Sequence, residues 1–222
     1  MGVSILIPTL NAEASLPETL RSVAAAEEII VVDGGSEDAT LRLARAGGVR
    51  VINAARGRGQ QMHAGAEAAT EDWLLFLHAD TSLARDWRSH VDAHIDGANA
   101  DEIVGVFRFK LDDATWQARA LEALVALRVL LFALPYGDQG LLIHRRLYAA
   151  LGGFRPLPLM EDVDFVRRIG RHRLRRLPCA AMTSAQRWRD DGWMARSARN
   201  LACLTMFSMG APIERIARFY ER

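Results

Sequence analysis

Short runs of apolar, β-branched residues alternate with helix-forming segments through the first 80 residues, and this alternation constrains the fold most. The runs that predict strands are "VSILIP" (3–8), "EIIVVD" (28–33), "VRVINA" (49–54) and "DWLLFLHAD" (72–80). The segments that predict helices between them are 15–26, 38–46 and 58–70, which are rich in Ala, Leu, Glu and Arg. Strand, helix and strand at this spacing form βαβ units, whose parallel sheet carries helices on both faces. We therefore expect an α/β fold with a mostly parallel, Rossmann-like central sheet.

The second half of the chain is less regular. Its pattern predicts a strand over 102–111, an apolar helix over 120–135, and a loop, strand and helix over 136–154. A helix over 159–172 opens with three carboxylates, and a long helix over 191–210 precedes a last one after Pro212. We expect one domain over 1–222, in which C-terminal helices complete the fold.

Composition narrows the class of protein. The 222 residues carry a formal net charge of +1, which argues against a nucleic-acid binder. Two cysteines, no signal-peptide pattern and no apolar run of about 18 residues favour a cytoplasmic protein without a membrane span. Arginines crowd residues 167–176 and more often form a solvated face than an anion site. That face and the apolar segments 120–134 and 193–209 leave open a peripheral membrane contact or a homodimer.

Polar side chains follow each of the four predicted parallel strands. Asn11 and Glu13 follow the first strand and Asp33 ends the second; Arg58 lies in a glycine-rich stretch after the third, and His78 and Asp80 end the fourth. In an open α/β sheet, ligands bind beyond the carboxyl ends of the strands. Each residue alone is explained by capping or turn formation, but four strand ends together predict a ligand crevice.

These side chains suit a nucleoside diphosphate. A carboxylate such as Asp80, together with phosphate oxygens, can hold Mg²⁺ or Mn²⁺. Asp33 and Glu13 can accept hydrogen bonds from a base or a ribose, and Arg58 can contact phosphate. Beyond this half, "LMEDVDF" places Glu161 and Asp162 at a helix start, where carboxylates also complement the helix dipole. Either carboxylate could act as a general base toward an acceptor hydroxyl.

Five motifs in order, "ILIPTLNAE", "IIVVDGGSEDAT", "GRGQQMHAGA", "LLFLHAD" and "LMEDVDF", resemble the inverting family-2 glycosyltransferases of GT-A fold. The resemblance covers roughly residues 3–170. "GDQG" and "QRWRDDGW" are similar to a smaller subfamily of arsenosugar-biosynthesis or radical-SAM-associated glycosyltransferases.

The resemblance implies a role for each matching residue. The nucleotide sugar, whose nucleoside is usually uridine, would be held by residues at the ends of the strands and by two residues of "QRWRDDGW". These residues are Pro8, Asn11, Glu13, Asp33, Arg58, His78, Arg187 and Trp188. Asp80 matches the last aspartate of the metal-binding DxD motif, and Asp162, beside Glu161, matches the catalytic base. Arg187 would stabilise the leaving diphosphate, although a simple salt bridge explains it equally well. Two departures affect the metal and the base: His78 occupies the first DxD position, and Gly34 replaces a frequent second aspartate.

The predicted activity is the transfer of a sugar, with inversion, from a nucleotide-sugar donor to an unidentified small-molecule or lipid acceptor. Residues 1–100 would bind the donor, with Mn²⁺ or Mg²⁺ as cofactor, and 101–222 would supply catalysis and the acceptor site. One alternative is a sugar nucleotidylyltransferase, but the loop "PTLNAEASLP" lacks the glycine-rich, basic character that such an enzyme needs after its first strand. The other is a nucleotide-sugar-binding protein without catalysis, which the presence of both Glu161 and Asp162 disfavours.

Overall fold

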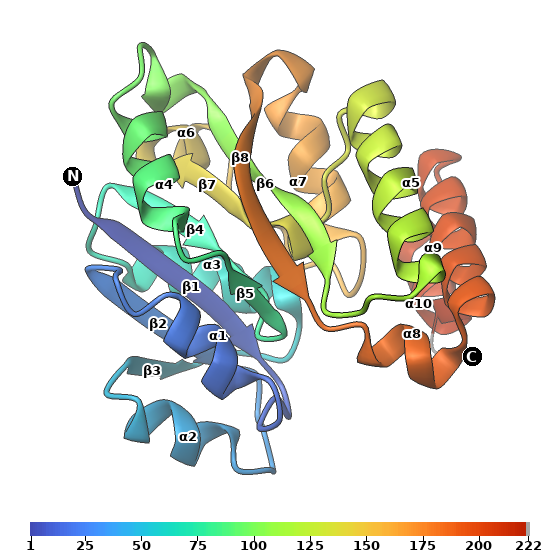
Figure 1. The fold of residues 1–222 in the computed structure, drawn as a ribbon, viewed down its shortest axis with the longest axis horizontal. Helices are drawn as coiled ribbons and strands as arrows, with labels where there is room; N and C mark the ends of the chain where they lie inside the picture. Colours follow the sequence, from blue (N-terminus) through green and yellow to red (C-terminus); the bar gives the residue numbers. More distant parts are fainter. Residues whose placement is uncertain (221–222) are drawn as a thin grey trace.

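The computed structural model describes residues 1–220 of the 222-residue chain, which form one eight-stranded sheet with helices around it (Figure 1). The strands are β1 (Val3–Thr9), β2 (Glu28–Asp33), β3 (Arg50–Asn53), β4 (Trp73–Phe76), β5 (Thr81–Leu83), β6 (Val104–Leu111), β7 (Leu141–His144) and β8 (Leu174–Thr183). The helices are α1 (Leu16–Ser22), α2 (Thr40–Ala46), α3 (Arg58–Ala68), α4 (Trp87–Ile95), α5 (Trp116–Phe132), α6 (Arg145–Ala150), α7 (Glu161–Ile169), α8 (Gln186–Asp191), α9 (Trp193–Ser208) and α10 (Ile213–Tyr220). The predicted α/β class is confirmed.

The sheet is mixed, with strand order β3-β2-β1-β4-β7-β6-β8-β5. The first four strands of this order pair in parallel, as do β6 and β8, while β7 and β5 run antiparallel to their neighbours. Thr9 is in register with Asp33 at the ends of β1 and β2. The carboxyl ends of β1 to β4 therefore lie at one edge, where the polar residues that follow them meet.

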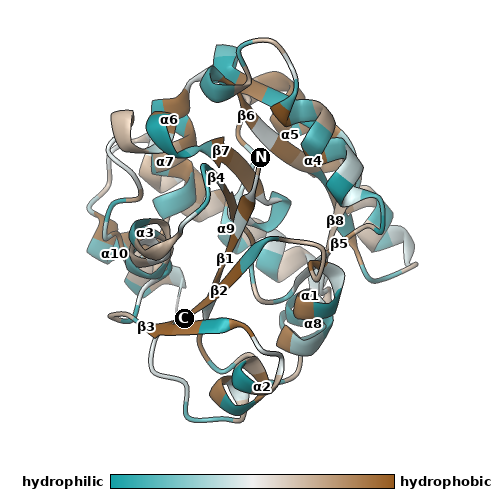
Figure 2. Cartoon of the chain, turned by 90° about the vertical axis from the view of Figure 1, so that its left-hand side faces the viewer, coloured by the Kyte–Doolittle hydropathy of each residue, from teal (hydrophilic) through white to brown (hydrophobic). Residues whose placement is uncertain are grey.

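Two apolar layers hold the helices against the sheet. Because side chains alternate along a strand, Ile5 and Ile7 pack with α1, α2 and α4 on one face, while Leu6 packs with α3, α6 and α7 on the other. Every residue of β1 is buried, as expected for a central strand covered on both faces. Figure 2 shows the apolar strands inside and polar residues over much of the outer helices.

The predicted fourth strand, 72–80, is too long. β4 ends at Phe76, and residues 77–80 form a loop whose Asp80 carbonyl accepts a hydrogen bond from Ser184 N (2.9 Å). Thr81 then begins the short strand β5, which pairs with the end of β8. Asp80 is therefore held in a loop between two strands, which brings it next to the end of β8.

β8 was not predicted, because five arginines in residues 167–175 indicated a solvated segment. The strand tolerates this charge because Arg175 and Arg176 are exposed while Leu177, Cys179 and Ala181 alternate into the core. That alternation of period two was the available signal. The predicted long helix over 191–210 is α9, and a separate short helix, α8, precedes it and ends at Asp191, before Gly192 (φ +83°).

The apolar helix expected over 120–135 is α5, which begins four residues earlier and stands with α9 and α10 at one end of the sheet (Figure 1). Leu124, Leu130 and Phe132 of α5 are exposed by 62%, 54% and 66%. Among residues 1–220, no helix is both long and apolar enough to cross a membrane. A membrane contact or a dimer through this helix stays a prediction.

Candidate active site

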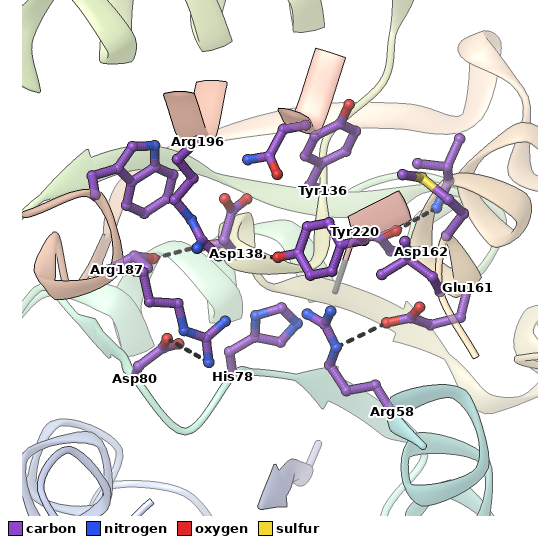
Figure 3. Close-up of a pocket in the computed structure, with 16 residues that line it drawn as sticks. Arg58, His78, Asp80, Tyr136, Asp138, Glu161, Asp162, Arg187, Arg196 and Tyr220 are labelled. Carbon is purple, nitrogen blue, oxygen red and sulfur yellow. Dashed lines mark hydrogen bonds and ion pairs between the residues drawn. The ribbon is translucent and has the colours of Figure 1, made fainter. Parts of the chain in front are cut away.

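Two adjoining cavities form the crevice beyond the ends of β1 and β4 and the start of α7. Five residues border both cavities: Arg58, His78, Asp80, Arg187 and Tyr220. Figure 3 shows the second cavity, with Tyr220 of α10 in its middle, between Arg58 and Arg196. The crevice thus combines residues from both halves of the chain.

The first cavity lies on the side of β1, and Pro8 and Asn11 border it. The Asn11 side chain also accepts a hydrogen bond from Glu37 N (2.9 Å). Glu13, predicted to contact the nucleoside, accepts one from Ala39 N (2.9 Å). Both side chains therefore fasten the loop after β1 to the loop after β2, and any contact with a ligand would be additional to this bond.

Asp33 is buried, and its carboxylate already accepts four hydrogen bonds. Oδ1 accepts from the hydroxyls of Thr9 (3.1 Å) and Ser36 (2.5 Å), and Oδ2 accepts from Gly35 N and Ser36 N (2.8 Å each). These bonds hold the pKa of Asp33 below its ordinary value against the opposing effect of burial. Since a carboxylate offers about four lone-pair positions, a nucleobase could bond here only if one hydroxyl turned away.

Asp80 lies in the loop after β4, and its carboxylate is 3.6 Å from Arg187 Nη2 of α8. The side chain of Asp80 is 20% exposed and that of Arg187 is 59% exposed, so solvent screens this pair. Within residues 1–220, no cluster of three His, Cys, Asp or Glu side chains could enclose a metal ion. A divalent cation bound here would therefore take most of its ligands from substrate phosphate and water, which is the usual habit of Mg²⁺.

His78, two residues before Asp80, borders the cavity with a half-buried ring whose Nε2 atom is buried. Its Nε2 atom has no hydrogen-bond partner among the described residues and packs against Gly137, where an added Cβ would lie 2.5 Å from this nitrogen. Burial, and then the charge of Arg58, lowers the pKa of His78 to about 4. The imidazole is therefore neutral at pH 7 and adds no charge to the site.

Arg58 at the start of α3 and Glu161 at the start of α7 form an ion pair, with Arg58 Nε 3.2 Å from Glu161 Oε1. Glu161 is 2% exposed, and its carboxylate raises the pKa of Arg58. The pair joins the two halves of the crevice across 103 positions of sequence. Burial raises the pKa of Glu161, and the Arg58 guanidinium opposes this effect. To act as a base, Glu161 would have to leave this buried ion pair, so it is the less suitable candidate.

Asp162 borders the second cavity, next to Glu161. Its Oδ2 accepts a hydrogen bond from Gly137 N (2.9 Å) and its Oδ1 accepts one from Val163 N (2.7 Å). Met160, the residue just before α7, has φ +63°, a left-handed conformation that costs energy in a non-glycine residue. The turn thus fixes Asp162 at the cavity wall, within reach of a bound molecule.

Trp188, the other predicted residue of α8, borders the same cavity and is 9% exposed. Its ring packs against Phe109 of β6, and the Arg196 guanidinium lies 5.4 Å from the ring centroid. Arg196 in turn donates to Asp191 (2.6 Å) and to the Tyr220 hydroxyl (3.0 Å). Trp188 therefore supports the cavity wall that carries Arg196.

Sequence reasoning missed several residues of the second cavity, above all Asp138, Arg196 and Tyr220. Asp138 stood within the quoted "GDQG" stretch, whose two glycines could have suggested a tight, functional turn. Burial raises the pKa of Asp138 to about 6, and Asp162 and Asp80 add to this effect while Arg128 and Arg58 oppose it. Arg196 and Tyr220 lie in C-terminal helices whose packing carries no sequence signal.

We expect Asp138→Asn to stabilise the protein at pH 7 but not at pH 4. Because the pKa of Asp138 is raised in the folded protein, binding of a proton to this carboxyl favours the folded state. This contribution to the free energy of unfolding is complete below pH 3.8 and is lost as the pH rises through about 6. Asparagine does not titrate, so the variant should gain on the order of 1–3 kcal/mol over the wild type between pH 4 and 7. Thermal unfolding across this range, with Asp101→Asn at an exposed position as control, measures the difference. A wild type that is the more stable at pH 7 would contradict the expectation.

Comparison with known proteins identifies a family and several relatives of this chain. Residues 4–155 match the family described as Glycosyl transferase family 2. A PGL/p-HBAD biosynthesis glycosyltransferase of Mycobacterium bovis is 44% identical over 91 residues, covering 36% of each chain. An uncharacterized glycosyltransferase of Mycobacterium bovis, Mb0553, is 37% identical over 83 residues, covering 37% of this chain and 38% of the relative. The match to these curated relatives thus spans little more than a third of their length.

Solved structures with the same fold include two with bound nucleotide. Glucosyl-3-phosphoglycerate synthase from Mycobacterium tuberculosis, in complex with Mn²⁺, UDP and glucosyl-3-phosphoglycerate, has a TM-score of 0.63 at 20% identity and covers 95% of this chain and 81% of its own. TarS 1-349 of S. aureus, in complex with UDP-GlcNAc, has a TM-score of 0.63 at 18% identity and covers 83% of this chain and 58% of its own. At these identities the likeness concerns the fold, which is that of GT-A glycosyltransferases.

Proposed function

Because the chain belongs to glycosyl transferase family 2, we propose that it transfers a sugar from a UDP-linked donor to an acceptor by a single inverting displacement. The observation that carries this proposal is that Asp80 and Asp162 border one cavity, from the loop after β4 and from the start of α7. A diphosphate at Asp80 would place the sugar toward Asp162. The UDP complexes of the two structures of like fold support the choice of nucleotide.

Asp80 is the proposed protein ligand of a divalent cation, Mn²⁺ or Mg²⁺. One partly exposed carboxylate that borders both cavities fits an ion held mainly by the donor's diphosphate. Such an ion, when bound, neutralises charge on the diphosphate. Arg187, 3.6 Å from Asp80, would add a second positive charge near the leaving group. His78, neutral and closely packed against Gly137, would shape this part of the site.

Asp162 is the proposed general base. In the reaction, the acceptor hydroxyl gives its proton to the Asp162 carboxylate while its oxygen bonds to the anomeric carbon. The bond from this carbon to the diphosphate oxygen breaks, and its electron pair leaves on the nucleoside diphosphate. Because attack and departure occur on opposite faces, the configuration inverts. The hydrogen bonds from Gly137 N and Val163 N would hold the carboxylate in place for this proton transfer.

The test of the activity needs no knowledge of the acceptor, because water can replace it. We expect the protein to release UDP from UDP-glucose or UDP-GlcNAc faster with Mn²⁺ than with a chelator present. Tight UDP binding without any release of UDP from the UDP-sugar would favour a binding protein. Formation of UTP and a sugar 1-phosphate from a UDP-sugar and pyrophosphate would favour a nucleotidylyltransferase.

UDP is expected to bind more tightly than CDP. Asp33 is the last residue of β2, and Asn11, just after β1, borders the first cavity. A carboxylate at this edge of the sheet can accept from the uracil N3–H, which cytosine lacks. Asp33 must release the Thr9 or Ser36 hydroxyl to do so, and Thr9 has Val32 O as an alternative acceptor (3.5 Å). Calorimetry with UDP and CDP measures the difference between their affinities, and Asp33→Ala should reduce this difference.

The control for this variant is its thermal unfolding, because the Asp33 side chain also holds its own turn. Loss of the turn's hydrogen bonds should cost on the order of 1–3 kcal/mol. Equal affinities of the wild type for UDP and CDP would exclude base recognition by Asp33. The narrower resemblance to arsenosugar-biosynthesis or radical-SAM-associated glycosyltransferases stays a prediction.

A further inference from the structure

Asp138 is a carboxylate of the second cavity that the proposed reaction does not use. It lies in the turn Gly137–Gln139 between α5 and β7, and this turn is fastened on three sides. Gly137 N donates to Asp162 Oδ2 (2.9 Å), Thr183 Oγ1 donates to the Asp138 carbonyl (3.2 Å), and Gln139 Nε2 donates to Phe107 O (3.1 Å). The backbone is therefore fixed, and the Asp138 side chain lies in the cavity that the proposed base also borders (Figure 3).

The side chain itself has no such support. Asp138 Oδ1 is buried without a hydrogen-bond partner in the described part of the chain, and no arginine or lysine of residues 1–220 forms an ion pair with it. Arg128 and Arg58 are near enough to influence its charge, as are Asp162 and Asp80 with the opposite sign. A buried carboxylate oxygen that lacks a partner is costly to the fold, so its presence in a rigid turn calls for a function.

A hydrogen-bond donor on a molecule in this cavity would satisfy the oxygen. The acceptor substrate is the molecule that must enter here, since its reacting hydroxyl has to reach Asp162. Asp162 and Asp138 both border this cavity, and Asp162 accepts from the amide of Gly137, the residue before Asp138, so a molecule that reaches Asp162 lies in the cavity that Asp138 also borders. The donor nucleotide, by contrast, belongs to the side of Asp80 and the first cavity.

We propose that Asp138 binds the acceptor, by accepting a hydrogen bond from a second hydroxyl or ammonium group next to the hydroxyl that receives the sugar. The acceptor is then a polyol, a sugar or an amino alcohol, and a simple alcohol is rejected because it leaves the Asp138 oxygen unpaired. This assignment rests on the proposed glycosyltransferase function. It makes Asp138 a determinant of acceptor specificity, distinct from the base.

The test compares acceptors with and without a further donor group besides the primary hydroxyl. The wild type is given UDP-glucose and Mn²⁺ with glycerol, ethanolamine or 1-propanol at equal concentration, and transfer products are measured by mass spectrometry beside the release of glucose by hydrolysis. We expect transfer to glycerol or ethanolamine to exceed transfer to 1-propanol at least about tenfold. Whether glycerol or ethanolamine is preferred shows whether the group that donates to Asp138 is a hydroxyl or an ammonium.

Two variants of Asp138 make the test specific. Asp138→Leu, which removes the acceptor oxygen at similar size, should abolish the preference, measured as the ratio of transfer to hydrolysis within the same variant. Asp138→Asn, which retains one oxygen, should keep part of the preference. A wild type that hydrolyses UDP-glucose but does not prefer glycerol or ethanolamine overturns the assignment, as does a Leu variant with unchanged preference or with hydrolysis as low as in Asp162→Asn. A wild type that neither hydrolyses nor transfers overturns the proposed function itself.

Discussion

Asp162→Asn is expected to lower kcat for UDP-sugar turnover by about two to four orders of magnitude and to leave donor affinity nearly unchanged. The amide keeps the size of the side chain but cannot take a proton from the attacking hydroxyl or water. Since proton transfer occurs only in the transition state, kcat should fall while binding of UDP stays the same. Steady-state kinetics and calorimetry with UDP separate the two effects.

Asp164→Asn is the matched control for this variant. Asp164 lies two residues farther along α7 and pairs with Arg168 (2.7 Å) and Arg155 (3.1 Å), away from the reacting groups. Its replacement should reduce stability and leave kcat unaffected. Near-normal turnover in Asp162→Asn would instead move the role of base to Glu161, which would have to leave its ion pair with Arg58.

Asp80→Ala is expected to remove the dependence of UDP binding on Mn²⁺. The carboxylate is the proposed protein contact of the ion, and no cluster of ligands among residues 1–220 could replace it. UDP affinity with Mn²⁺ should fall to the level measured with a chelator. Calorimetry of UDP with and without the ion, on the wild type and the variant, measures this loss.

Arg187→Ala provides the comparison, because it removes the partner of Asp80 and keeps the carboxylate. We expect this variant to bind UDP more weakly than the wild type but to retain stimulation by Mn²⁺. If stimulation by the ion survives in Asp80→Ala, the ion binds elsewhere and the assignment of Asp80 is wrong.

The first half of the fold, from β1 to β4, could be predicted because its sequence signals are local. The strands β1, β2 and β4 are short apolar runs that need burial on both faces, and parallel pairing then places Asn11, Asp33 and Asp80 at one edge. The strand β8 escaped prediction because arginines interrupt its alternating pattern. Its burial is decided by pairing with β6, which is distant in sequence.

The contacts of the site depended on such distant pairing and were not predictable. Nothing near Glu161 in the sequence indicates its ion pair with Arg58, and nothing near Asp33 shows that Thr9 would share its carboxylate. Asp138 was visible only as a residue of a glycine-containing turn. Its unpaired oxygen results from the packing of that turn against α7 and β8, which the chain establishes only when folded.

The configuration of the released sugar tests the central proposal most directly. Proton NMR of UDP-glucose with the protein and a divalent ion identifies the first anomer formed, before mutarotation mixes the two forms, and water suffices as acceptor. A single displacement with Asp162 as base predicts that β-glucose appears first from the α-linked donor and that Asp162→Asn forms almost none. Initial release of α-glucose, or no turnover of UDP-glucose or UDP-GlcNAc by the wild type, would contradict the inverting mechanism proposed for this crevice.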